Sequence, residues 1–123
     1  MIIADTNIWI AYLEGGSGPD VEAFEVALTD QILRIAPVVI AELLSDPALS
    51  EDTESQLESI PVLDLLPGFW PRAGKLRSRL LYDGMRPKLA DTLIAQTCLD
   101  YEAVLLTRDV GFRSYVSYGL KLF

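Results

Sequence analysis

Two acidic residues follow short apolar runs near opposite ends of the sequence. Asp5 comes directly after the run 2–4, and Asp109 comes shortly after the run 103–106. Both runs have the composition of buried parallel strands, which deliver a polar residue at their carboxyl ends. Because ligands of open parallel sheets bind beyond those ends, we expect both carboxylates to lie at one edge of a sheet.

Two further acids lie in segments whose neighbours are mostly apolar. Glu42 lies within an apolar helical stretch that begins after Pro37, and Asp91 lies near the start of another, 87–101. A carboxylate buried without a partner is costly, so acids in such settings are usually paired or bound to a metal ion. Glu42 and Asp91 are therefore the third and fourth candidates for one acidic site.

The residue types in the chain select the chemistry of such a site. The sequence contains no histidine, which excludes histidine acid–base catalysis, Ser-His-Asp triads and histidine metal sites. The one cysteine, Cys98, lies in an apolar helical stretch and is typical of a core residue. Oxygen ligands alone favour Mg²⁺ or Mn²⁺ over Zn²⁺.

Each of the four acids also has an ordinary structural explanation, which the sequence leaves open. These explanations are a strand-end turn for Asp5, an ion pair with Arg34 or Arg108 for Glu42, a helix-dipole acid for Asp91 and a helix cap for Asp109. The positions of all four acids together favour one metal site over four separate explanations.

Apolar periodicity and turn residues divide the chain into alternating strands and helices. The predicted strands are 2–4, 32–35, 62–65, 103–106 and 120–123. The predicted helices are 6–13, capped by Thr6, and then 19–28, 38–44, 50–60, 67–82, 87–101 and 112–118. This alternation indicates an α/β fold, a three-layer α/β/α sandwich with a central, mostly parallel sheet of four or five strands.

The length and composition indicate a single domain over residues 1–123. Half of the residues are hydrophobic, which is enough for one core, and the chain is too short for two ordinary domains. No apolar run reaches the roughly 18 residues that cross a bilayer. A lone cysteine and the absence of a basic leader before the first apolar run lead us to expect a cytoplasmic protein.

The net charge of −8 is divided unequally along the chain. Residues 1–71 carry thirteen acids and one base, giving −12, whereas residues 72–123 carry five acids and nine bases, giving +4. Such asymmetry is a hint of nucleic-acid contact, and a solvated helix face has the same composition. The bases predicted to hold a nucleic-acid backbone are Arg72, Lys75, Arg79, Arg86 and Lys88.

Three aromatic residues are alternative candidates for base stacking. Trp9 and Tyr12 lie on the apolar first helix, where packing against a partner subunit is favoured over stacking. Trp70 lies near the basic segment and is the better stacking candidate, with core packing still favoured.

Four short motifs resemble, in their order, those of the PIN domain family. They are Asp5-Thr6-Asn7 after the opening strand, Glu42 in Val-Ile-Ala-Glu-Leu, Asp91 in Lys-Leu-Ala-Asp-Thr-Leu-Ile-Ala, and Thr107-Arg108-Asp109 followed by Phe112. The likeness covers essentially the whole chain. Its length and its early first motif are most similar to VapC-type toxins of toxin–antitoxin modules.

The resemblance implies a metal-dependent endoribonuclease that uses Mg²⁺ or Mn²⁺, a cognate antitoxin as partner, and a homodimer. It implies Asp5 and Asp91 as the first choice of direct metal ligands, with Glu42 and Asp109 binding directly, through water or at a second ion. The supporting residues are Thr6, Asn7 and Thr107. In-line attack by a metal-activated water would leave a 5′-phosphate and a 3′-hydroxyl.

Three other functions are compatible with parts of this pattern. A PIN-like nuclease could process RNA or act on DNA without an antitoxin, and a degenerate PIN domain could serve only as an interaction module. A receiver-like signalling domain also gathers acids around Mg²⁺, but it expects paired acids after the first strand. Here Asp5 is followed by Thr6 and Asn7, and Asp64 lies within its predicted strand, which disfavours the receiver.

Overall fold

The computed structural model describes residues 1–123 and contains one sheet of four parallel strands. The strands lie in the order β2-β1-β3-β4. Their bounds are β1 Ile2–Ala4, β2 Leu33–Arg34, β3 Val104–Leu106 and β4 Lys121–Leu122. The predicted α/β class and the parallel sheet are confirmed.

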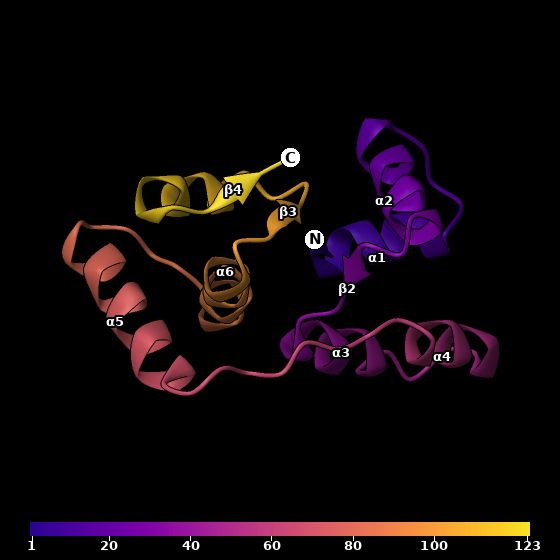
Figure 1. Cartoon of the computed structure of the whole chain (residues 1–123), viewed down its shortest axis with the longest axis horizontal. Coiled ribbons are helices and arrows are strands. Elements are labelled where there is room, and N and C mark those ends of the chain that lie inside the picture. Colours follow the sequence, from indigo (N-terminus) through magenta and orange to yellow (C-terminus); the bar gives the residue numbers. More distant parts are fainter.

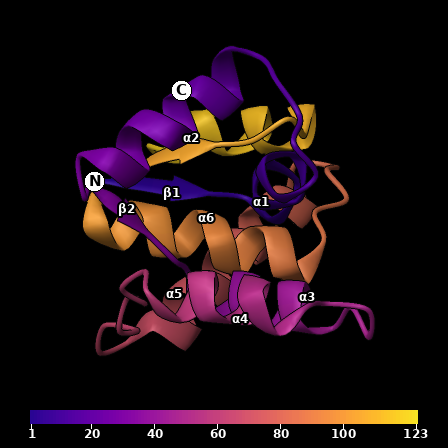
Figure 2. The ribbon, with the colours of Figure 1, turned by 90° about the vertical axis from the view of Figure 1, so that its right-hand side faces the viewer.

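Helices connect the strands and cover both faces of the sheet (Figures 1 and 2). Figure 2 shows α2 and the yellow 3₁₀-helix η1 on one side of the sheet and α6 directly on the other side, with α3, α4 and α5 beyond α6. The three-layer arrangement is therefore confirmed. The bounds are α1 Thr6–Leu13, α2 Pro19–Thr29, α3 Pro37–Leu44, α4 Glu51–Glu58, α5 Phe69–Tyr82, α6 Leu89–Tyr101 and η1 Val110–Tyr118.

The register of the two central strands sets the position of the residues that follow them. Ala4 is paired with Leu106 across β1 and β3, and the amide of Asp5 donates to the carbonyl of Leu106 at 2.8 Å. The chain therefore leaves both strands at the same edge of the sheet. Asp5 and the segment 107–109 consequently lie next to each other, although about a hundred residues separate them.

The central helix α6 packs along the sheet between α5 and α3. Ile94, Ala95 and Cys98 on this helix are almost fully buried. Cys98 is a core residue, as predicted, and burial raises the pKa of its thiol to about 12. A thiol that keeps its proton at neutral pH is a poor nucleophile. No helix of the chain is long and apolar enough to span a bilayer.

The predicted strand at 62–65 is wrong. This segment forms only an isolated bridge between Ile35 and Val62, in which the amides of Ile35 and Leu63 donate to the carbonyls of Pro61 and Ile35. Pro61 has no N–H group, so it contributes no donor that would extend the pairing along the edge of the sheet. The sheet therefore stops at β2.

Most helices begin within two residues of the predicted position, but the cap of the first helix and the type and start of the last one differ from the prediction. Asp5, not Thr6, is the N-cap of α1, and its Oδ1 accepts from the amide of Thr6 at 2.7 Å. The last helix is a 3₁₀-helix that begins at Val110, two residues earlier than predicted, because the Oδ1 of Asp109 caps it at the amide of Gly111. Asp109 is thus the helix cap that was its alternative explanation, and Asp5 is also a helix cap, where a strand-end turn had been the alternative.

The predictions for the two tryptophans are also wrong. Trp9 is 2% exposed and packs edge-on against Phe24 of α2 at a centroid distance of 4.8 Å, so it cannot face a partner subunit. Tyr12 packs against the same ring at 4.6 Å. Trp70 is 63% exposed at the start of α5 and lies outside the core. The packing of α2 on α1 could not be predicted from the sequence of either helix alone.

Candidate active site

Asp5 is the most restrained carboxylate at the edge where the strands end. Its side chain is buried, with 6% of the residue exposed, and Oδ2 accepts from the hydroxyl of Thr107 at 2.8 Å. Burial raises the pKa of Asp5, the hydrogen bonds from Thr107 and Thr6 lower it, and the nearby Glu42 and Asp109 raise it further. The net result is a raised pKa, which makes the charged form costly.

Thr107 links Asp5 to the start of η1. Its hydroxyl donates to Asp5, and its Oγ1 accepts from the amide of Asp109 at 3.0 Å. The carboxylate of Asp109 in turn accepts from the amide of Gly111 at 2.8 Å. Thr107 follows β3 and Asp5 follows β1, and the hydrogen bond between them fixes the orientation of both side chains.

Asp91 lies half-buried in the first turn of α6, where the helix begins below the same edge of the sheet. Burial raises its pKa to about 6, with further contributions from Asp5, Asp109 and Glu42, whereas Lys88 acts to lower it. A helix-dipole acid alone would have a lowered pKa. The raised pKa of Asp91 is therefore the opposite of what the dipole alone predicts, and its causes are burial and the neighbouring carboxylates.

Glu42 reaches this group from α3, in a setting that differs from the prediction. Its side chain is exposed to solvent, because the apolar neighbours of α3 face the core while Glu42 faces outward. Its Oε1 accepts from the hydroxyl of Thr6 at 2.9 Å. Neither predicted arginine partner contacts it: Arg34 donates to backbone carbonyls, and Arg108 pairs with Asp20.

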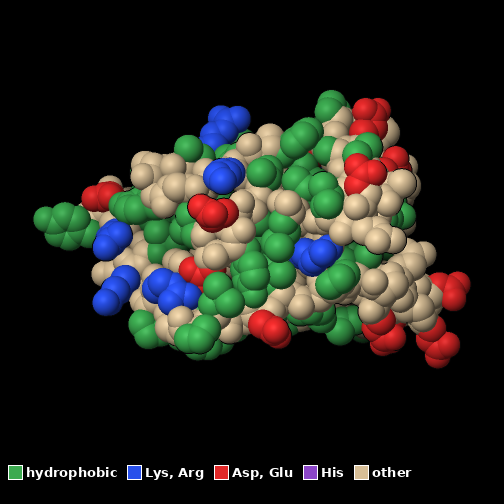
Figure 3. All heavy atoms as spheres, in the orientation of Figure 1, with side chains coloured by type: hydrophobic (Ala, Val, Ile, Leu, Met, Phe, Trp, Pro, Cys, Tyr) green, Lys and Arg blue, Asp and Glu red, His purple; other side chains and the backbone are tan.

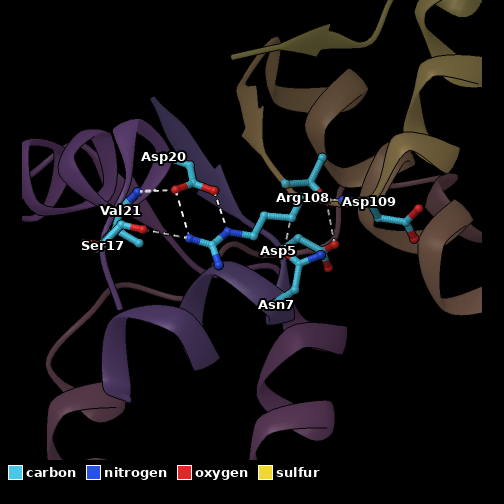
Figure 4. A network of polar contacts seen from close by, with 8 residues as sticks. Asp5, Asn7, Ser17, Asp20, Val21, Arg108 and Asp109 are labelled. Carbon is cyan, nitrogen blue, oxygen red and sulfur yellow. Dashed lines mark hydrogen bonds and ion pairs between the residues drawn. The ribbon is translucent and has the colours of Figure 1, made fainter. Parts of the chain in front are cut away.

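Arg108 connects the segment after β3 to the first turn of α2 and to the loop before it (Figure 4). Its Nε and Nη2 donate to the two carboxylate oxygens of Asp20 at 2.6 and 3.0 Å. The hydrogen bond from Arg108 is the largest cause of a lowered pKa of Asp20. The amide of Arg108 donates to Oδ1 of Asn7 at 3.3 Å, which places Asn7 beside the acidic group.

A cleft of about 410 Å³ opens beside two of the four acids. Asp91 and Asp109 line it together with Arg86 and Lys88, which come from the loop before α6. The cleft thus brings carboxylates and two of the predicted backbone-binding bases to one surface. Such a mixed lining suits a polyanion that must approach acidic groups.

One residue that lines this cleft was missed by sequence reasoning. Tyr115 is buried at the cleft wall, and its hydroxyl lies 2.8 Å from the hydroxyl of Thr92, one residue after Asp91. Burial raises the pKa of Tyr115, which stays protonated at neutral pH. Tyr115 belongs to no motif, and its position on an irregular 3₁₀-helix gave no periodic signal.

The other predicted bases lie on α5, outside the cleft. Lys75 and Arg79 are exposed, and Figure 3 shows basic side chains gathered at the α5 end of the molecule, opposite the acidic side chains near α2 and α4. Arg72 differs because its guanidinium donates to both oxygens of Asp100, at 3.0 and 2.6 Å. Gln96 donates to the same Asp100, so Arg72 is held in a structural network.

The donor set matches the chemistry of a hard divalent ion. The four carboxylates provide only oxygen, and no histidine or cysteine lies among them. Burial first, and the neighbouring carboxylates second, raise the pKa values of Asp5 and Asp91, and a bound cation would offset both costs of the charged form. No three of the acidic side chains lie close enough together to hold an ion in this arrangement. Hydrogen bonds hold Glu42 to Thr6 and Asp109 to Gly111.

Comparison with solved structures finds similar folds along the whole chain. VapBC2 from Rickettsia felis, bound to promoter DNA, is 25% identical with a TM-score of 0.77, covering 100% of this chain and 98% of that chain. VapBC-1 from nontypeable Haemophilus influenzae is 25% identical with a TM-score of 0.77, covering 100% and 97%. FitAcB from Neisseria gonorrhoeae is 22% identical with a TM-score of 0.73, covering 100% and 96%.

Comparison by sequence gives a family match. No curated protein matches the chain. The family model described as PIN domain matches residues 2–116, which include every acid of the candidate site. The order of the motifs, the parallel sheet and this match agree, and the chain therefore belongs to the PIN domain family.

Proposed function

We propose that this PIN domain is a metal-dependent endoribonuclease that hydrolyses RNA phosphodiester bonds, and that it is the toxin of a toxin–antitoxin pair. One observation carries the proposal. Four carboxylates from separate elements approach one edge of the sheet, next to a cleft that two bases also line. The family supports nuclease activity, and the metal and the RNA substrate are inferred from the chemistry of this site.

Asp5 and Asp91 are our first choice for holding Mg²⁺ or Mn²⁺, with Glu42 and Asp109 completing the set directly or through water. When bound, such an ion would lower the pKa of a water molecule and offset negative charge on the scissile phosphate. The role of Thr6 and Thr107 is to fix the two oxygens of Asp5 by the hydrogen bonds they donate.

Asn7 is proposed as a contact to the substrate. Because the amide of Arg108 is a donor, the atom of Asn7 that faces it must be the carbonyl oxygen. The Nδ2 group of Asn7 makes no hydrogen bond within the protein and can donate to a phosphate oxygen. In this assignment the Oδ1 of Asn7 binds the protein and its Nδ2 group binds the RNA.

The cleft bases would hold the RNA backbone. Arg86 and Lys88 line the cleft beside Asp91, so they are placed to contact the phosphates nearest the cleavage site. Lys75 and Arg79 are exposed on α5 and would act at longer range. Arg72 would contribute least, because Asp100 already engages its guanidinium.

The toxin role is supported by the structural neighbours, which are VapBC and FitAB complexes. A groove between α1, α3 and α4 is lined by apolar side chains, which include Ile10 and Leu43, and by the acids Glu14, Glu42 and Asp46. An antitoxin segment with apolar and basic side chains would be complementary to it. The proposal further includes a homodimer, testable by analytical ultracentrifugation, and a cytoplasmic location.

The proposed function is tested with purified protein and a labelled single-stranded RNA. We expect cleavage that requires Mg²⁺ or Mn²⁺, stops on chelation and leaves 5′-phosphate ends, with DNA of the same sequence as the control. Cleavage that continues in excess chelator would refute the metal requirement. Cleavage of DNA but not RNA would refute the substrate.

A further inference from the structure

We propose that Arg108 is a positioning residue, which pairs with Asp20 across the site and thereby holds Thr107 and Asp109 in place. The inference rests on the proposed function, because it concerns how the candidate metal ligands are held. The structure contains two ion pairs, and Arg108–Asp20 is the one that joins the acidic first part of the chain to the segment after β3.

The contacts of the Arg108 guanidinium are directional. Nε and Nη2 each meet a different oxygen of Asp20, at 2.6 and 3.0 Å, and Nη2 also lies 3.3 Å from the carbonyl of Ser17. The Oδ1 of Asp20 is itself fixed by the amide of Val21 at 2.8 Å. A two-point contact of this kind fixes the orientation of the arginine as well as its distance.

The residues on either side of Arg108 have the opposite orientation. Thr107 donates to Asp5, and Asp109 lines the cleft, whereas the side chain of Arg108 extends toward the loop between α1 and α2 (Figure 4). Residue 108 lies in a bend, in which the Oγ1 of Thr107 accepts from the amide of Asp109 at 3.0 Å. Thr107, Arg108 and Asp109 therefore form one local turn, and fixing the Arg108 side chain restrains the orientation of that turn.

Asp20 lies in the first turn of α2, and the glycine that caps this helix allows the close approach of Arg108. Gly18 has a φ of +134°, a conformation that residues with side chains rarely adopt. A Cβ atom at Gly18 would lie 3.0 Å from Oδ1 of Asp20 and 3.7 Å from Nη2 of Arg108. The glycine thus leaves the space that the ion pair occupies.

The pair is too exposed to be important for overall stability. The side chains of Arg108 and Asp20 are 44% and 23% exposed, and ion pairs in such settings contribute little to folding. A local contact can nevertheless fix a catalytic geometry, because small displacements of reacting groups cost large factors in rate. Positioning therefore predicts a loss of activity without a loss of stability.

The test compares four variants in the full chain. They are Arg108→Ala, Arg108→Lys, Asp20→Asn and the reversed pair Asp20→Arg with Arg108→Asp. Glu22→Gln is the matched control, because it removes an exposed acid from the same first turn of α2 that makes no hydrogen bond there. The measurements are kcat and KM for RNA cleavage, Mn²⁺ affinity by electron paramagnetic resonance, and the melting temperature without metal.

We expect Arg108→Ala and Asp20→Asn to lower kcat by roughly 10- to 100-fold with KM little changed, and to weaken Mn²⁺ binding several-fold. Arg108→Lys should lower kcat less, and the reversed pair should recover much of the lost kcat. Glu22→Gln should have the kcat and the Mn²⁺ affinity of the wild type. The melting temperatures should agree within about 2 °C.

Three outcomes would overturn the inference: wild-type kcat and Mn²⁺ affinity in Arg108→Ala, an equal loss in Glu22→Gln, or a loss of activity that tracks a fall in melting temperature. A wild-type protein that binds Mn²⁺ but cuts no RNA would instead refute the proposed function, and the Mn²⁺ affinities would still decide the role of Arg108. A wild-type protein that binds no Mn²⁺ would refute both.

Discussion

The carboxyl edge of the sheet and the surface of α5 hold charge in opposite ways. At the edge, Asp5 is buried among other acids, and Asp91 has a pKa raised to about 6. On α5, Lys75 and Arg79 are exposed and far less constrained. Burying like charges costs stability, whereas spreading charges in water costs almost nothing. The edge is therefore where charge costs stability, as the proposed metal site requires, and α5 is where long-range attraction of RNA is available.

Neutralising Asp5 should produce the largest change. Asp5→Asn removes a proposed metal ligand, and losing several kcal/mol of charge stabilisation corresponds to a roughly 10²- to 10³-fold fall in kcat. The same change removes a costly buried charge, so the metal-free melting temperature should rise by about 2–6 °C. Cleavage rates and calorimetry measure the two effects. An Asp5→Asn protein that cuts RNA at the wild-type rate would contradict the role of Asp5 as a metal ligand. A melting temperature below that of the wild type would contradict the cost assigned to its buried charge.

The second largest expected effect is on the pH dependence of stability, which should depend on the acids at the sheet edge and not on the bases of α5. Folding raises the pKa of Asp91 from 3.8 to about 6, so the folded state binds this proton more tightly than the unfolded state. The contribution of the protonated Asp91 to the free energy of unfolding is present below about pH 4 and is lost as the pH rises through about 6. The metal-free protein should therefore lose stability over this range.

Asp91→Asn should flatten that dependence, and Mg²⁺ should restore stability to the wild type above pH 6. Denaturant unfolding at several pH values measures both effects. Lys75→Gln provides the control, because it changes one charge on α5 and should leave the slope as in the wild type. Equal slopes for wild type and Asp91→Asn would contradict the role given to burial.

Removing the bases should affect RNA binding more than folding. Arg86→Gln with Lys88→Gln should weaken binding about tenfold and reduce the salt slope by about 0.7 for each phosphate that is no longer neutralised. Lys75→Gln with Arg79→Gln should have a smaller effect, because these bases lie outside the cleft. Arg72→Gln should have the least effect on binding. It should lower stability only slightly, because the Arg72 side chain is 40% exposed, although Asp100, at 9%, loses its partner. Fluorescence anisotropy at several salt concentrations and thermal unfolding test this order, and an inverted order would contradict it.

The positions of the acids after apolar runs were sufficient to predict that Asp5 lies beside the segment 107–109. Short apolar runs ending at Asp5 and near Asp109 predict adjacent parallel strands, and parallel strands share a carboxyl edge. The hydrogen bond from Thr107 to Asp5 follows from that register. The fold class and the family resemblance rested on the same local signals, which is why both were confirmed.

Contacts set by tertiary packing could not be predicted in this way. The Arg108–Asp20 pair joins residues 88 positions apart, and either side chain alone resembles an ordinary surface charge. Glu42 was expected to be buried because its neighbours are apolar, but only one side of α3 faces the core. Trp9 is covered by Phe24 of another helix. Each of these positions depends on which element lies opposite, and periodicity within one segment carries no such information.

The central claim is that the carboxylates at the edge of the sheet bind a divalent cation. Its most direct test is the melting temperature as a function of Mn²⁺ concentration for the wild type, Asp5→Asn and Asp91→Asn. A cation bound only by the folded state stabilises it by RT ln(1 + [L]/Kd), about 2.7 kcal/mol at 100 Kd. We predict a progressive rise for the wild type and little or no rise for either variant. An equal rise in all three proteins, or none in the wild type, would contradict the claim.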